Sequence, residues 1–61
     1  MNYLTILNFE EGKVFQYKIS DKQSRDEEKI EEFATKLGHN LTNCEWMVHK
    51  DSKIYKNEYN D

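Results

Sequence analysis

Two stretches decide the fold of this chain: YLTILNF at residues 3–9 and VFQYKI at residues 14–19. Both are dense in β-branched, aromatic and aliphatic residues, a composition that is typical of β-strands. Between them lies EEGK at residues 10–13, where Gly12 can adopt the left-handed backbone conformation that closes a tight turn. The sequence therefore predicts a β-hairpin.

The register of this hairpin has two solutions. A three-residue loop pairs Phe9 with Lys13, and a four-residue loop pairs Phe9 with Val14. Because side chains alternate between the two faces of a strand, this choice decides which side of each strand meets the core. The three-residue loop gathers five apolar side chains on one face, namely Leu7, Phe9, Phe15, Tyr17 and Ile19.

An amphipathic helix is expected after the hairpin. Apolar residues recur at positions 30, 33, 34 and 37, which is the spacing of one helical face. Ser24, with Glu27 three residues later, has the form of a capping box, and Gly38 can end the helix in the left-handed conformation. The pattern predicts a helix over residues 25–37.

One or two further strands follow the predicted helix. Residues 44–48, CEWMV, alternate in the strand manner with Cys44, Trp46 and Val48 on one side. A turn at 50–53 leads to Ile54 and Tyr55, which can form a short fourth strand, and the polar residues 56–61 are expected to fray.

These elements predict one small α+β domain over residues 1–61, with the pattern ββαβ(β) and a mostly antiparallel sheet that carries the helix on one face. A helix that returns along the sheet delivers the third strand antiparallel to the first, so the expected strand order is 2-1-3.

The predicted central strand is apolar on both sides, with Leu4 and Ile6 on one and Leu7 and Phe9 on the other. A single helix covers only one of these faces. The second face needs the tail, a dimer mate or a protein partner as its cover. Four aromatic residues are candidates for contact with a partner: Trp46, which is otherwise a core residue, and Tyr3, Tyr17 and Tyr55, which we expect on the bare face.

The charges favour a protein partner over nucleic acid. Nine basic and twelve acidic residues give a net charge of −3, the wrong sign for contact with phosphates. Three acidic residues of the helix point away from its apolar face and form a negative patch suited to a basic surface, including one that normally receives nucleic acid: Glu28, Glu31 and Glu32. No apolar stretch is long enough to span a membrane, so we expect a cytoplasmic protein.

Catalytic, cofactor and metal chemistry are disfavoured. Cys44 is the only cysteine, and its separation of five from His49 places the two side chains on opposite faces of a strand, so they do not form a metal site with His39. The serines lie in polar turns, and 61 residues rarely enclose the walls that a catalytic site requires. We therefore expect a non-enzymatic protein without cofactor or metal.

Two segments carry a resemblance to a known group of proteins: LTIxNFxxGxV at residues 4–14 and GHxLTNCEWMV at residues 38–48. In these segments the chain resembles short uncharacterised proteins encoded by tailed phages and prophages. The resemblance implies a role in binding a host protein, including the inhibition of a bacterial defence component. It implies no activity and no functional residues.

Taken together, the sequence predicts a small protein-binding module that acts by steric blocking. Two alternatives remain open: a structural protein that assembles as a homodimer through its second sheet face, and an acidic mimic of nucleic acid.

Overall fold

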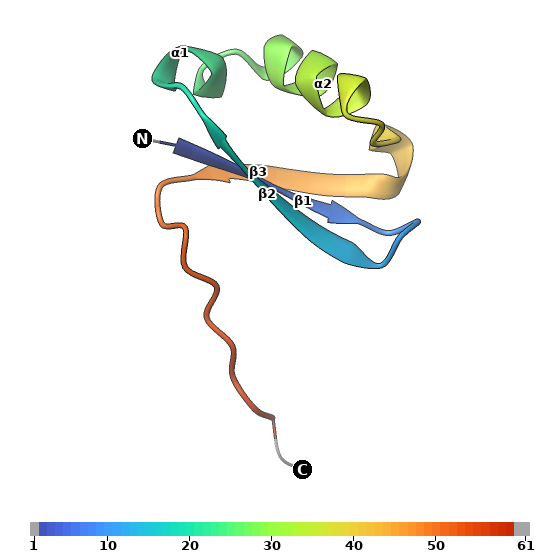
Figure 1. The fold of residues 1–61 in the computed structure, drawn as a ribbon, viewed down its shortest axis with the longest axis vertical. Helices are drawn as coiled ribbons and strands as arrows, with labels where there is room; N and C mark the ends of the chain where they lie inside the picture. The colour runs from blue at the N-terminus through green and yellow to red at the C-terminus, as the bar shows by residue number, and fades with distance from the viewer. Residues whose placement is uncertain (1, 60–61) are drawn as a thin grey trace.

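The computed structural model describes residues 2–59, which form a sheet with helices on one face (Figure 1). The sheet contains three strands, β1 (Asn2–Asn8), β2 (Lys13–Ile19) and β3 (Cys44–His49). The helical segments are α1 (Asp21–Ser24), α2 (Glu27–Lys36) and the 3-10 turn η1 (Leu41–Asn43). The predicted α+β pattern is confirmed, with one strand after the helices.

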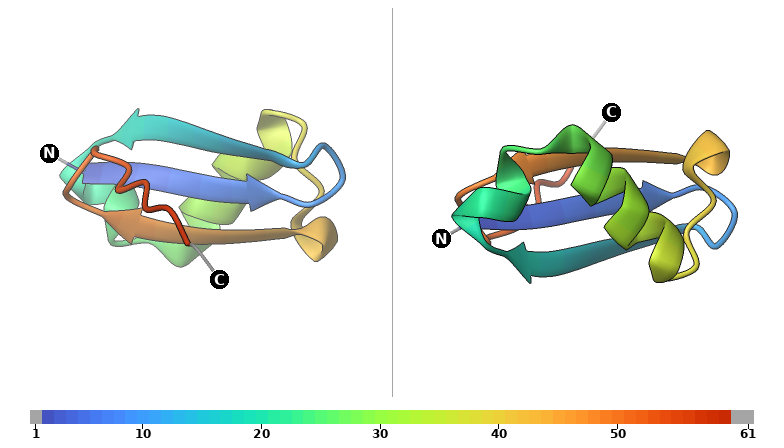
Figure 2. Two further views of the ribbon diagram at one scale, coloured as in Figure 1. Left: turned by 90° about the horizontal axis from the view of Figure 1, so that it is seen from below. Right: turned by 90° about the horizontal axis from the view of Figure 1, so that it is seen from above.

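The strand order is β2-β1-β3, and β1 pairs antiparallel with both neighbours, as predicted. The segment between β2 and β3 crosses over β1, with α2 running diagonally across the sheet (Figure 2). A core of buried apolar side chains fills the space between α2 and the sheet: Leu4, Ile6, Ile19, Ile30, Ala34 and Cys44.

Both predicted hairpin registers are wrong. Asn8 pairs with Lys13 and Leu7 with Val14, so the loop consists of residues 9–12. The cause is local, because the Asn8 side chain accepts a hydrogen bond from the Glu11 backbone N–H at 3.0 Å and the Asn8 carbonyl accepts one from Gly12 at 2.8 Å. These bonds end the strand at Asn8 and place Phe9 in the turn, which Gly12 closes with a φ of 64°.

The observed register changes the face on which three residues of β2 lie. Phe15, Tyr17 and Ile19 share the helix-covered face with Leu4 and Ile6, rather than a face with Leu7 and Phe9. The prediction that Tyr17 lies on the bare face is therefore wrong. Trp46 lies with Cys44 and Val48 on the helix-covered face, as the alternation in β3 predicts.

The helix begins later than predicted, because two other caps form. Ser20 and Gln23 make the capping box of the single-turn helix α1, and Asp26 caps α2 by accepting a hydrogen bond from the Lys29 N–H. The end of α2 agrees with the sequence. Gly38 has a φ of 95°, and the N–H groups of Gly38 and His39 donate to the carbonyls of Thr35 and Ala34.

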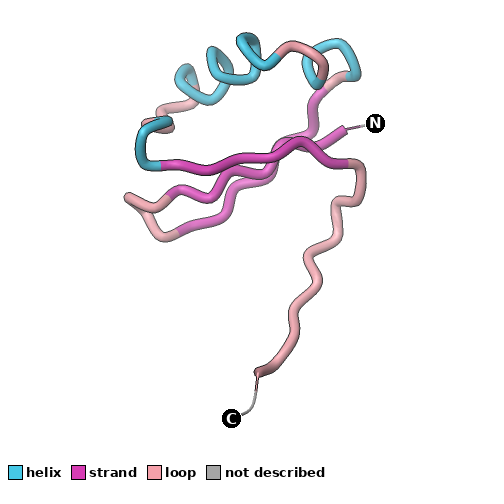
Figure 3. Tube along the Cα trace, turned by 180° about the vertical axis from the view of Figure 1, so that it is seen from behind, coloured by secondary structure: helices cyan, strands magenta, loops and turns pink. Residues whose placement is uncertain are grey.

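The predicted fourth strand at Ile54 and Tyr55 does not form in the described chain. Residues 51–59 contain no helix or strand and are exposed throughout. They leave the end of β3 on the side of the sheet opposite the helices (Figure 3). The predicted frayed segment 56–61 extends two residues beyond the described range. No helix in residues 2–59 is long and apolar enough to cross a membrane.

Candidate functional site

One face of the sheet is bare of helices. The alternation of the three strands places nine side chains on it, which we call the open face: Tyr3, Thr5, Leu7, Val14, Gln16, Lys18, Glu45, Met47 and His49. Large apolar side chains lie exposed there, with 42% of Leu7, 57% of Val14 and 59% of Met47 accessible to solvent. Burial of such area is worth about 25 cal/mol per Å², so the open face retains a driving force for association.

A shallow hollow of about 170 Å³ lies on this face between β1 and β3, and its lining residues are Thr5, Leu7, Glu45, Trp46 and Met47. The surface of the hollow is apolar, so Glu45 lines it with carbon atoms rather than with its carboxylate. Its chemistry suits an aliphatic or aromatic side chain.

A chain of hydrogen bonds crosses the middle of the open face. The Gln16 amide donates to the Thr5 hydroxyl, which itself contacts His49 Nε2. His49 Nδ1 donates to the carbonyl of Asp51 at 2.9 Å, so Nε2 is the acceptor of the Thr5 proton. The imidazole also stacks on Tyr3, with ring centroids 6.1 Å apart.

Hydroxyl, imidazole and carbonyl thus stand in the order that nucleophilic catalysis uses. They lie on a flat sheet surface that is open to water, whereas catalysis by such a pair needs an enclosed site with a stabilised oxyanion. We interpret this chain of hydrogen bonds as an ordering device that fixes the side chains of the open face.

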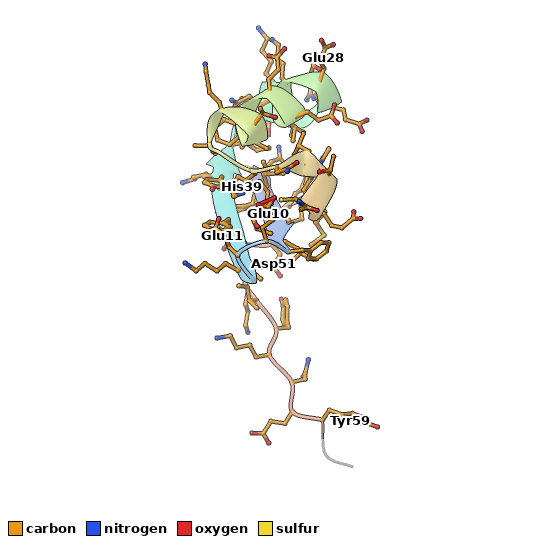
Figure 4. The ribbon with its side chains drawn as sticks, turned by 90° about the vertical axis from the view of Figure 1, so that its right-hand side faces the viewer. Glu10, Glu11, Glu28, His39, Asp51 and Tyr59 are labelled. Carbon is orange, nitrogen blue, oxygen red and sulfur yellow. The ribbon has the colours of Figure 1, made fainter. Side chains whose placement is uncertain are left out.

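A second polar cluster, which sequence reasoning missed, lies under the helix. The side chain of His39 is only 5% exposed, and Figure 4 shows it between the helix layer and the sheet. Its Nδ1 accepts a hydrogen bond from the Asn8 amide at 3.0 Å, and its Nε2 donates to the Tyr17 hydroxyl at 2.8 Å. Edge contacts with Phe15 and Tyr17 complete the enclosure of the ring.

Both ring nitrogens of His39 in this cluster form hydrogen bonds with protein groups. Burial, with the charge of Glu11 second, raises the pKa of Tyr17, and the neutral phenol accepts the hydrogen bond from His39 Nε2. No buried side-chain nitrogen or oxygen in the described residues lacks a hydrogen-bond partner. The cluster is therefore a closed structural joint between the hairpin and the end of α2. Its members lie 31 and 22 residues apart, so no local sequence pattern indicates it.

The acidic residues Glu28, Glu31 and Glu32 are exposed on α2, as predicted. They line a shallow, open depression with Thr35 and Lys36. Figure 4 shows Glu28 on the outer side of the helix layer, away from the sheet. The negative patch and the open face are consequently on opposite sides of the molecule.

The aromatic candidates do not gather in one place. Tyr3 is half-buried on the open face, Tyr17 is in the closed joint, and Trp46 packs against the core on the helix-covered face of β3. Tyr55 lies beyond β3 and is 66% exposed. Of these four residues, only Tyr3 is therefore available to a partner on the open face itself.

Asp51 organises the chain where it leaves the sheet. Its carboxylate accepts hydrogen bonds from the Lys53 N–H at 2.9 Å and from the Tyr55 hydroxyl at 2.5 Å. These two bonds, and more weakly the nearby His49, lower the pKa of Asp51, and the same hydroxyl bond raises the pKa of Tyr55. The Lys53 ammonium lies 5.0 Å from the centre of the Tyr55 ring. The turn predicted at 50–53 is therefore built around one exposed carboxylate.

Residues suited to metal binding are dispersed. Cys44 and His49 point to opposite faces of β3, as their spacing predicts, and both nitrogens of His39 are already bonded. Within residues 2–59 no three His, Cys, Asp or Glu side chains are grouped to hold an ion.

No protein-family model, curated protein or solved structure matches this chain.

Proposed function

We propose that this chain is a small, non-enzymatic protein-binding module that contacts its partner through the open face. One observation carries the proposal: Leu7, Val14 and Met47 stand exposed together on a sheet face that no helix covers. Apolar side chains of this size are the usual anchors of protein interfaces, because their burial supplies most of the free energy of association.

The open face is better suited to this role than the acidic helix. The patch of Glu28, Glu31 and Glu32 is fully hydrated, and exposed charges add more to the rate of association than to its free energy. A binding surface needs an apolar centre, which in this chain lies on the sheet. The acidic helix would then remain on the outside of a complex.

The partner is a host protein in the bacterial cytoplasm, and the mechanism is steric. This part of the proposal is supported by the resemblance to short phage proteins, whose usual mode of action is to occupy a host surface. A module of 61 residues covers a patch of its partner without chemistry, and blocks whatever normally binds there. A component of a bacterial defence system is the partner that fits this role.

Affinity capture with matched variants tests the proposal. The native chain, Met47→Glu and Glu31→Lys are used as bait in bacterial lysate, and binding of the purified captured protein is then measured directly. Both substituted residues are exposed, so both variants keep the fold. We expect Met47→Glu to weaken binding at least about tenfold, because it places a charge in the apolar contact, and Glu31→Lys to change the equilibrium little.

The opposite result would reject the open face as the contact surface. If Met47→Glu binds like the native chain while Glu31→Lys does not, the acidic helix carries the interaction, and the nucleic-acid mimic becomes the better description.

A further inference from the structure

The chain after β3 extends into the space in front of the open face. Figure 1 shows it running away from the sheet on the side opposite α1 and α2. We call residues 52–59 the arm. It has no contact that buries its apolar side chains, since 59% of Ile54, 66% of Tyr55 and 87% of Tyr59 are accessible. Any molecule that sits on the open face therefore meets the arm as well.

The direction of the arm is set by its base. The Asp51 carboxylate binds the Lys53 N–H and the Tyr55 hydroxyl, while the Asp51 carbonyl accepts from His49 on the open face. These bonds hold the first residues of the arm in a turn that points outward, so the arm does not fold back along its own sheet. The apolar residues of the arm are presented to another molecule.

The open face alone covers less area than a standard stable interface. Strands of seven, seven and six residues, at about 3.3 Å per residue and about 4.8 Å between strands, give a footprint of about 320 Å². A standard stable interface buries about 800 Å² on each partner. An extended arm over residues 52–59 is about 26 Å long. The arm that each copy gives adds to this footprint, whereas the arm that it receives covers area of the open face already counted.

We infer that the occupant of the open face in the free protein is a second copy of this chain, and that the arm of each copy packs along the open face of the other. The inference rests on the proposed function, in that it requires the open face to be a protein-binding surface. Such a dimer is symmetric and closed, because each copy contributes the same two surfaces.

Charge and shape support this arrangement. Each copy has a net charge of −3, and packing through the open faces places the two acidic helices on the outer sides of the dimer, where their repulsion is smallest. The hollow between β1 and β3 has Glu45 at its edge, and the arm carries Lys53 and Lys56 on either side of Ile54 and Tyr55. An apolar side chain of the arm suits the apolar hollow, and its flanking lysines complement the negative charge of Glu45, which is exposed on the same face.

The dimer has a consequence for the proposed function. A host protein that uses the open face competes with the second copy, so the arms must release before it binds. We expect the observed rate of partner binding to rise less than proportionally with the concentration of this chain above the dissociation constant of its dimer, because the fraction of free monomer falls.

Sedimentation equilibrium of the full chain over a wide concentration range tests the inference. A monomer has a mass of 7.4 kDa, and we expect the mass to approach twice this value as concentration rises. Met47→Glu on the open face and Ile54→Glu on the arm should each raise the dissociation constant of the dimer at least about tenfold. Leu37→Glu is the matched control. Leu37 is also exposed, but it lies at the end of α2, so its substitution should leave the mass unchanged.

Isotope-filtered NMR distinguishes an arm that packs on the other copy from an arm that folds back on its own sheet. In a mixture of labelled and unlabelled chains, contacts from the Ile54 methyl groups to the Met47 methyl group should appear between molecules. Contacts found only within one chain would overturn the inference, and so would a dimer that Ile54→Glu leaves intact.

The remaining outcomes distinguish the inference from the proposed function. A chain that stays monomeric at every concentration, while Met47→Glu still abolishes capture of a host protein, overturns the dimer and supports the open face as the binding surface. A dimer that Met47→Glu does not weaken overturns the inference, whatever the capture experiment gives.

Discussion

Substitution of His39 offers the sharpest test of how this small domain holds together. The ring joins the hairpin to the end of α2 through Asn8 and Tyr17 and is 5% exposed. His39→Ala removes the nearer acceptor of the Asn8 amide and leaves only the 3.4 Å bond to Glu11 Oε2, at about 1–3 kcal/mol. It also removes edge contacts with Phe15 and Tyr17, at about 0.5–1.5 kcal/mol each. The expected loss is about 2–6 kcal/mol.

That loss is large for a chain of 61 residues, whose total stability is expected near 3–9 kcal/mol at roughly 0.05–0.15 kcal/mol per residue. We therefore expect His39→Ala to unfold a substantial fraction of the molecules at 25 °C. Urea unfolding followed by the fluorescence of Trp46 measures the change, because this single tryptophan packs against the core. A stabilising osmolyte keeps the variant folded enough to measure.

A double-mutant cycle isolates the hydrogen bond within this total. Tyr17→Phe removes only the hydroxyl that accepts from His39, so in the native background it should cost about 1–2 kcal/mol, since the buried His39 N–H loses its partner. In the His39→Ala background the same change should cost little, which gives a coupling near 1 kcal/mol. Tyr3→Phe on the open face is the matched control and should be almost neutral. Equal costs of Tyr17→Phe in both backgrounds would refute the role of the joint.

Three further changes test other parts of the structure. Phe33→Ala should cost about 2–3 kcal/mol in urea unfolding, because the half-buried ring lies edge-on to Tyr17 at 5.6 Å; a parent-like midpoint would show that α2 is not docked there. The folded pKa of Asp51 is lowered from its ordinary value of 3.8, so the turn at the base of the arm should be complete above pH 3.8 and lost as the pH falls below it. The chemical shift of the Lys53 amide reports this titration. A titration midpoint at or above pH 3.8 would contradict the geometry. Replacing Glu28, Glu31 and Glu32 of α2 by lysine should leave the thermal midpoint within a few degrees of the parent. A large loss of thermal stability would mean that these side chains stabilise the fold.

The strand order and the end of the helix were predictable because each depends on a strong local signal. Dense apolar runs indicated β1 and β2, and Gly38 indicated the end of α2 because glycine can adopt the positive φ that it has in the structure. The arrangement of β1 between β2 and β3 then followed from the connections alone. The hairpin register and the start of the helix, in contrast, each have local alternatives of similar free energy.

The register and the start of the helix required such choices, and sequence reasoning failed on both. Asn8 ends β1 with its own side chain, a competition between turn and strand that the apolar character of Phe9 conceals. Three residues, Ser20, Ser24 and Asp26, all have the chemistry of an N-cap. Ser20 and Asp26 serve as the caps, while the Ser24 hydroxyl donates to the Asp21 carbonyl inside α1. A shift of one residue in register was enough to move Tyr17 from the predicted bare face to the covered one.

The composition of the open face is not explained by the fold itself. Thr5, Gln16 and His49 show that polar side chains occupy this face and bond to one another across the strands. Leu7 and Met47 stand beside them, although neither residue type is among the best strand formers. A sheet that only had to shield its other face would tolerate polar residues at both positions. Their exposed apolar area is accounted for when a second surface covers it, because the driving force of about 25 cal/mol per Å² is realised only on contact.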